Sequence, residues 1–126
     1  IPAYERVRAQ LQAADAVLIV SPEHNRSMPA AVKNLLDIAS RPAGKSLWGG
    51  KKTAVITASP GSYGGINSGL HIRQSLQAMS ADVMIAPEVF LSRAHTALAD
   101  GQVSDARTAA FLNKFAAAFY AWAQAE

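Results

Sequence analysis

The sequence predicts an α/β fold, in which a parallel sheet is covered by helices on both faces. Along its 126 residues, short runs of apolar and β-branched residues alternate with segments whose apolar residues recur at helical spacing. Strands that alternate with helices are typical of parallel sheets joined by right-handed crossovers. The length fits one domain of ~100–150 residues, which we assign to residues 1–126.

The first half of the chain predicts a helix, a strand and a second helix. Apolar residues at helical spacing place the first helix over residues 4–14. Residues 16–20, Ala-Val-Leu-Ile-Val, are an uninterrupted apolar run that predicts a strand buried on both faces. Ser27 is expected to cap the next helix, which Pro42 and Gly44 then end.

The second half continues the alternation. A second buried strand is expected over residues 53–58, and Ile72 and Leu76 mark the face of the helix that follows. Ser104 is expected to open the last helix, with a stripe of aromatic residues that indicates core or subunit packing. The remaining expectations are a short strand over residues 83–86, an edge extension over 88–91 and a loop over 94–101.

Three strong strands are few for this type of fold, since open doubly wound sheets carry about five or more. The chain also begins with Ile1 and Pro2 rather than with methionine. Both observations favour an amino-terminal strand–helix–strand unit upstream of Ile1, so that the domain in residues 1–126 is expected to be incomplete.

Composition excludes several classes of protein. Twelve Lys and Arg against nine Asp and Glu give a net charge of +3, spread without the basic stripe of a nucleic-acid binder. The absence of cysteine excludes disulfides, thiolate metal sites and cysteine nucleophiles. No apolar run approaches the ~18 residues of a membrane span, and no signal peptide is visible. We therefore expect a cytoplasmic protein that binds neither nucleic acid nor membrane.

Two polar loops are the candidate ligand site. Residues 21–27 and 59–65 each follow a predicted strand, and ligands of open parallel sheets bind beyond the carboxyl ends of the strands. Each loop also precedes a helix, whose amino-terminal N–H groups favour anions. Ordinary strand–helix turns have a similar composition, and the residues alone leave both interpretations open.

The side chains of the loops suit a flat, polar ligand. Three glycines among residues 61–65 allow close approach of the backbone, and Tyr63 and His24 can border an aromatic ring. The candidate binding residues are Pro22, Glu23, His24, Asn25, Arg26, Ser59, Pro60, Gly61, Ser62, Tyr63, Gly64 and Gly65.

Other motifs are weaker. His24, His71 and His95 lack the close spacing of zinc ligands, so no metal site is expected. Ser62 lies among glycines but outside a Gly-x-Ser-x-Gly elbow, and no other nucleophile or acid–base pair stands out. We therefore assign no catalytic side chain.

The two loops together carry a resemblance to a known family. Residues 14–29, which include Pro-Glu-His-Asn-Arg-Ser-Met-Pro, resemble the NAD(P)H-dependent FMN reductases, flavodoxin-like quinone, azo-dye and chromate reductases. Residues 59–65, Ser-Pro-Gly-Ser-Tyr-Gly-Gly, are similar to the family's second flavin loop. Residues 70–74 and Pro87-Glu88 also fit its pattern.

The chain departs from the family pattern at several positions. His24 stands in place of the usual tyrosine, Ile38 in place of a tryptophan, and Leu35-Leu36 in place of Ala-Ile. The family's first strand, its phosphate-binding loop, its first helix and its second strand have no counterpart in this sequence. The resemblance therefore implies a three-layer α/β/α sandwich that lacks its first strand–helix–strand unit.

The resemblance also implies a function. FMN would lie with its ring against both loops, NADPH or NADH would supply hydride to flavin N5, and a quinone or similar small molecule would accept the electrons. A homodimer or homotetramer is implied as well, with the helix that carries His71 and Arg73 as a contact face. The alternative is a non-catalytic flavodoxin-like binding or assembly module.

Overall fold

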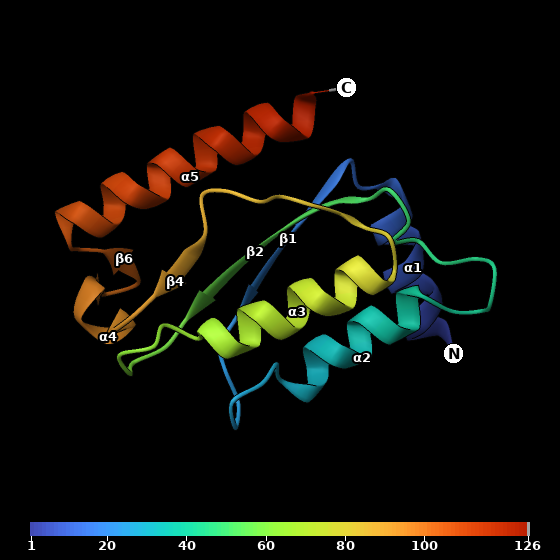
Figure 1. Ribbon diagram of the computed structural model, residues 1–126, viewed down its shortest axis with the longest axis horizontal. Helices are drawn as coiled ribbons and strands as arrows, with labels where there is room; N and C mark the ends of the chain where they lie inside the picture. The colour runs from blue at the N-terminus through green and yellow to red at the C-terminus, as the bar shows by residue number, and fades with distance from the viewer. Residues whose placement is uncertain (126) are drawn as a thin grey trace.

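The computed structural model describes residues 1–125 as a four-stranded parallel sheet with helices on both faces (Figure 1). The strands are β1 (Ala16–Ser21), β2 (Lys52–Ala58), β3 (Asp82–Val83) and β4 (Val89–Leu91). The helices are α1 (Pro2–Ala13), α2 (Ala30–Ala39), α3 (Ile66–Ala78), α4 (Ala94–Ala97) and α5 (Ala106–Gln124). A small antiparallel hairpin of β5 (Leu98–Ala99) and β6 (Gln102–Val103) precedes α5. The predicted α/β class is confirmed.

β2 is the central strand. β1 pairs with its whole length in parallel, from Ala16 opposite Lys52 to Ser21 opposite Thr57. On the other edge, β3 pairs with the start of β2 and β4 with its end. The predicted third strand over residues 83–86 is therefore shorter than expected, and its proposed extension is a separate strand. Pro87, in the interval between them, has no N–H to donate to a ladder.

One core lies between the sheet and the three helices α1, α2 and α3, which share one face (Figure 1). It joins Leu11 of α1, Leu36 of α2 and Ile72 of α3 to Ile19 and Val55 of the sheet. A smaller core on the opposite face joins Ile56 and Val89 to Phe115 of α5, with Phe119 and Trp122 partly buried beside it. The predicted aromatic stripe thus packs on the sheet, except that Phe111 is 36% exposed.

The prediction that the first strand is buried on both faces is wrong for the described residues. Ile19 and Ser21 are buried against the three-helix face, but Leu18 is 40% and Val20 is 65% exposed on the other. The reason is that α5 packs on β2 and β4, and no described element covers this face of β1. An apolar strip therefore runs along β1.

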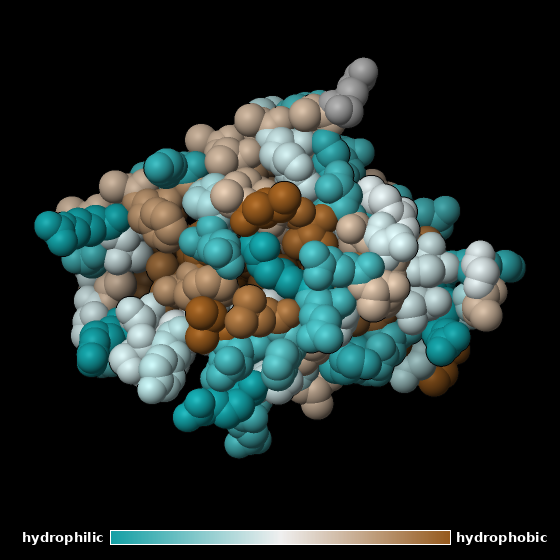
Figure 2. Space-filling model, in the orientation of Figure 1, coloured by the Kyte–Doolittle hydropathy of each residue, from teal (hydrophilic) through white to brown (hydrophobic). Residues whose placement is uncertain are grey.

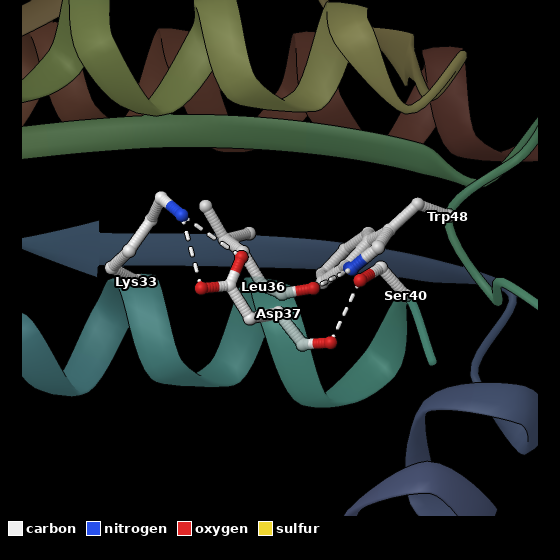
Figure 3. A network of polar contacts seen from close by, with 5 residues as sticks. All are labelled: Lys33, Leu36, Asp37, Ser40 and Trp48. Atoms are coloured by element: carbon white, nitrogen blue, oxygen red, sulfur yellow. Dashed lines mark hydrogen bonds and ion pairs between the residues drawn. The ribbon is translucent and has the colours of Figure 1, made fainter. Parts of the chain in front are cut away.

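Trp48 anchors the connection between α2 and β2. Its side chain is fully buried, and its indole N–H donates to the carbonyl oxygen of Leu36 at 2.9 Å (Figure 3). On the same helix, Lys33 forms an ion pair with Asp37 at 2.9 Å, and the Ser40 hydroxyl donates to the Asp37 carbonyl at 2.7 Å. The last turn of α2 and the loop after it are thereby joined to the core.

The last helix begins one residue later than predicted, with Asp105 rather than Ser104 as its cap. The Asp105 carboxylate accepts hydrogen bonds from the Thr108 backbone N–H at 2.9 Å and from its hydroxyl at 2.7 Å. The Ser104 hydroxyl bonds the Ala97 carbonyl instead. The expected loop over residues 94–101 contains α4 and one strand of the hairpin.

These hydrogen bonds make the contribution of Asp105 to stability depend on pH. Bonding by the Thr108 hydroxyl, and then by its N–H, holds the pKa of Asp105 below its ordinary 3.8. Because the folded pKa is lowered, the contribution is complete above the unfolded pKa and is lost as pH falls through the folded pKa. We expect Asp105→Asn, which keeps an acceptor but no charge, to show a smaller loss of stability in acid than the wild type. Urea midpoints measured from pH 6 to pH 2 test this, and parallel curves would contradict it.

Within residues 1–125, none of the helices combines the length and the apolarity that a membrane span requires.

Candidate functional site

Both predicted loops lie at the end of the sheet where β1, β2 and β4 terminate (Figure 1). Residues 22–29 connect β1 to α2, and residues 59–65 connect β2 to α3. Since β1 and β2 are adjacent and parallel, their carboxyl ends lie side by side. The structure therefore brings the twelve predicted site residues to one edge of the sheet.

The first loop ends in a tight turn. His24 and Ser27 exchange backbone hydrogen bonds of 2.9 and 3.0 Å, and φ is +53° at Asn25 and +67° at Arg26. Positive φ at both central residues is the pattern of a type I′ turn, which favours Asn followed by Gly. Asn25 suits its position, whereas Arg26 occupies the one that glycine prefers. The turn therefore presents the Arg26 side chain at a conformational cost of about 1 kcal/mol or more.

The second loop packs tightly against the sheet through Gly64 and Gly65. Both are buried with positive φ, and the Gly64 carbonyl accepts a hydrogen bond of 2.8 Å from the Thr57 hydroxyl. A Cβ atom at Gly64 would lie 2.6 Å from the Phe90 carbonyl oxygen. A side chain at Gly64 is thus disfavoured twice, by the clash with the backbone of β4 and by the positive φ of the turn.

A third segment, at the end of β4, completes this edge and was missed by sequence reasoning. The Leu91 carbonyl accepts from Ser59 N–H at 3.0 Å, and Arg93 N–H donates to the Gly61 carbonyl at 2.9 Å. Arg93 is exposed and adds a cation beside the second loop. The available signal was its place just after an apolar strand, the same rule that identified the other two loops.

The start of α3 holds the first loop through Glu23. α3 begins after Gly65, which has no side chain to cap it, and its first turn contains no acidic residue. A Glu23 carboxylate oxygen accepts a hydrogen bond of 3.0 Å from the Ser68 backbone N–H. The Ser68 hydroxyl, fully buried, donates to the Pro22 carbonyl at 2.9 Å. One amino-terminal N–H group of α3, that of Ser68, is therefore already paired with a protein carboxylate.

A second contact joins the same helix to the other end of the first loop. The Ser27 hydroxyl and His71 Nδ1 lie 2.8 Å apart. Ser27 is therefore not the helix cap that was predicted; α2 begins after Pro29, without a side-chain cap. Ser68 and His71 are three residues apart, so they share one face of α3. Their spacing of three residues is the sequence signal that both can contact the first loop.

The tips of the two loops are in contact as well. The Arg26 guanidinium lies over the Tyr63 ring, with its central carbon 5.6 Å from the ring centroid. Tyr63 is 66% exposed, so this cation–π contact is at the surface. The first loop is thus joined to the first turn of α3 by Ser68 and to the tip of the second loop by Arg26.

Several backbone donors at this edge are available to a ligand. Within the described chain, no hydrogen bond is formed by the N–H groups of Asn25 and Arg26, nor by those of Ser62 and Tyr63. Such donors on two adjacent loops suit the polar edge of a flat heterocycle. No group of three or more metal-ligating side chains occurs among residues 1–125. The arrangement fits a planar organic ligand.

Comparisons with known proteins agree with this geometry. The sequence profile of the NADPH-dependent FMN reductases matches residues 2–96. The chain is 41% identical over 120 residues to a quinone reductase of Pseudomonas putida, covering 95% of this chain and 64% of that protein. It is 38% identical over 116 residues to a 2-hydroxy-1,4-benzoquinone reductase of Burkholderia sp., covering 91% and 63%.

A solved structure shows the same fold. The chain matches FerB, a flavoenzyme NAD(P)H:(acceptor) oxidoreductase of Paracoccus denitrificans, with a TM-score of 0.90 and 36% identity, covering 98% of this chain and 69% of that one. The predicted flavodoxin-like fold is confirmed. The chain spans just under two-thirds of the length of the curated relatives it matches. The profile match, the identities and the shared fold lead to one conclusion: this chain belongs to the NADPH-dependent FMN reductase family.

Proposed function

We propose that the protein containing this chain is an NAD(P)H-dependent flavin oxidoreductase that uses FMN to reduce a quinone. The observation that carries the proposal is the meeting of residues 22–27 and 59–65 at one edge of the sheet, with unpaired backbone donors on both. Membership of the FMN reductase family and the quinone reductases among its relatives support the cofactor and the class of acceptor.

In this proposal the chain binds and orients FMN, and none of its side chains acts as a nucleophile. When bound between the two loops, FMN would supply the redox chemistry, with its N5 atom as the hydride acceptor between NADPH or NADH and the quinone. Backbone N–H groups of the first loop, around Asn25, would hold the pyrimidine edge of the ring. Tyr63 and the backbone of Gly61, Gly64 and Gly65 border the ring from the second loop. The absence of side chains at Gly64 and Gly65 lets the second loop pack against Phe90 and Thr57 of the sheet, which would hold the loop in place beside the ring.

The test uses the full-length protein. It is expected to bind FMN, with quenching of the flavin fluorescence, and to oxidise NADPH or NADH in the presence of a small quinone. The test variant is Ser62→Pro, which removes one unpaired N–H donor from the second loop and is expected to weaken FMN binding. A wild-type protein that neither binds FMN nor oxidises the nicotinamide would contradict the proposal.

We further propose that the family fold continues past the open edge of β1. Among residues 1–125, β1 pairs only with β2, and Leu18 and Val20 leave an exposed apolar strip on its outer face. A further parallel strand with its helix would cover both side chains, and about a third of the length of the relatives lies outside the part matched here. The domain of residues 1–126 would then be part of a larger domain, which supplies the grip on the FMN phosphate.

We also propose self-association through α3. Its surface exposes Ile66 and Leu70, at 36% and 47%, and buries the Arg73 Nε atom without a partner among the described residues. Figure 2 shows hydrophobic surface on this side of the molecule, over the region of α3 and the segment between β3 and β4. Leu70→Arg is expected to shift the protein toward monomer in light scattering, whereas Tyr120→Arg on α5 is not. An unchanged mass for Leu70→Arg would contradict this contact.

A further inference from the structure

We infer that Glu23 is a positioning residue, which acts as the missing amino-terminal cap of α3 and so holds the two flavin loops in one arrangement. The inference rests on the proposed function, because it concerns how the FMN site is assembled. It assigns the Glu23 side chain a role distinct from contact with the ring.

The amino terminus of α3 has no side-chain cap of its own. An α-helix leaves its first N–H groups without internal partners, and a carboxylate is the favoured acceptor because of the positive end of the helix dipole. Gly65 offers no side chain, and the first turn of α3 has no acidic residue. Gly65 cannot be replaced by a capping residue either, since a Cβ atom there would lie 2.9 Å from Thr57 Cβ. The cap must therefore come from elsewhere in the chain.

Glu23 of the first loop supplies the missing acceptor. Glu23 lies 45 residues before Ser68, in the loop after the neighbouring strand, and accepts its N–H at 3.0 Å. The partly buried position of this bond strengthens it, because charge-assisted hydrogen bonds weaken as water competes for the charge. The Glu23 side chain thus links the first loop to α3, the helix that follows the second loop.

Two neighbouring contacts also join α3 to the first loop. The Ser68 hydroxyl holds the Pro22 carbonyl at 2.9 Å, and His71 holds Ser27 at 2.8 Å, so α3 contacts the first loop at both of its ends. Between these anchors lies the turn of Asn25 and Arg26, whose positive φ angles would relax if the anchors were released. The geometry needed for the ring therefore depends on Glu23 although its carboxylate faces the helix.

The experiment compares Glu23→Gln and Glu23→Ala with the wild type in the full-length protein. Gln keeps an acceptor without the charge, and Ala removes both. The first readout is amide hydrogen exchange of Ser68 in the absence of FMN, expected to accelerate at least about tenfold in Glu23→Ala and less in Glu23→Gln. Exchange of Leu76, buried at the far end of α3, is expected to stay unchanged, which separates a local effect from global destabilisation.

The second readout is the dissociation constant of FMN from fluorescence quenching. We expect it to rise about tenfold in Glu23→Ala, with partial rescue in Glu23→Gln. Glu5→Gln is the matched control, because Glu5 is a carboxylate in the first turn of another helix, α1, away from the loops; it is expected to change neither readout. Unaltered Ser68 exchange in Glu23→Ala would overturn the inference, as would an FMN affinity within twofold of the wild type.

The two proposals fail in different ways. If the wild-type protein binds no FMN, the proposed function fails, while Ser68 exchange still reports whether Glu23 caps α3. If FMN binds but the Glu23 variants leave affinity and exchange unchanged, only the positioning role is wrong.

Discussion

Replacing Trp48 by alanine is expected to destabilise the fold by about 3–5 kcal/mol, the range for loss of a large aromatic side chain from a core. Trp48 has no exposed surface and packs with Leu36, Ile72 and Leu76 between the sheet and the helices. The substitution removes this contact area and also leaves the Leu36 carbonyl without its donor. Because the free energy of unfolding of domains is about 5–15 kcal/mol, this substitution would remove a large part of it.

Two milder variants separate packing from hydrogen bonding. Trp48→Phe keeps an aromatic ring but removes the N–H, and is expected to cost about 1–3 kcal/mol. Trp122→Phe is the matched control, since Trp122 is only partly buried and its indole N–H has no partner in the described chain. Urea unfolding followed by far-ultraviolet circular dichroism measures all three. A cost below about 1 kcal/mol for Trp48→Ala would show that the loop after α2 is not anchored in this way.

The second large effect is expected from Gly64→Ala, which should lower the free energy of unfolding by about 2–4 kcal/mol. Left-handed backbone costs a non-glycine residue about 1–2 kcal/mol, and φ at Gly64 is +64°. The added Cβ atom would also lie 2.6 Å from the oxygen and 2.7 Å from the carbon of the Phe90 carbonyl, which is backbone and cannot rotate away. Forced overpacking of this kind typically costs a further ~1–3 kcal/mol.

Gly50→Ala is the control that isolates the clash. Its φ of +70° is close to that of Gly64, but no atom lies within 4 Å of the added Cβ. It should therefore show the backbone cost alone. Urea midpoints give the two costs, and FMN titration of the full-length protein shows whether displacement of the second loop weakens binding. Equal costs for the two variants would mean that the loop moves away from β4 freely.

The sequence by itself determined the types of the main helices and strands and the place of the candidate site. The apolar run of residues 16–20 and the β-branched-rich run of residues 53–58, Thr-Ala-Val-Ile-Thr-Ala, indicated two strands of a largely buried sheet. The rule that parallel strands present ligands at their carboxyl ends then brought residues 22–26 and 59–65 to one edge. The two loop motifs also indicated the family that the comparisons confirm.

Only the tertiary structure decided what individual polar side chains do. Ser27 has the chemistry of a helix cap, yet its hydroxyl lies beside His71, a residue 44 positions away. Glu23 looks like a ligand-facing carboxylate, yet it accepts from the backbone of α3. Local patterns report the intrinsic preference of a residue, whereas the partner of a hydrogen bond depends on which distant segments the fold brings within about 3 Å.

The burial of β1 also depended on the tertiary structure. The apolar run of residues 16–20 predicts burial on both faces, but Val20 remains 65% exposed, since burial requires a second surface and α5 packs over β2 and β4 instead. Hydrophobic periodicity determines which side chains favour burial, and the arrangement of the other elements determines which of them are covered. For this chain, the sequence therefore specified the strands, the loops and the family, while the packing of α3 and α5 decided how the loops are held and which face of the sheet stays open.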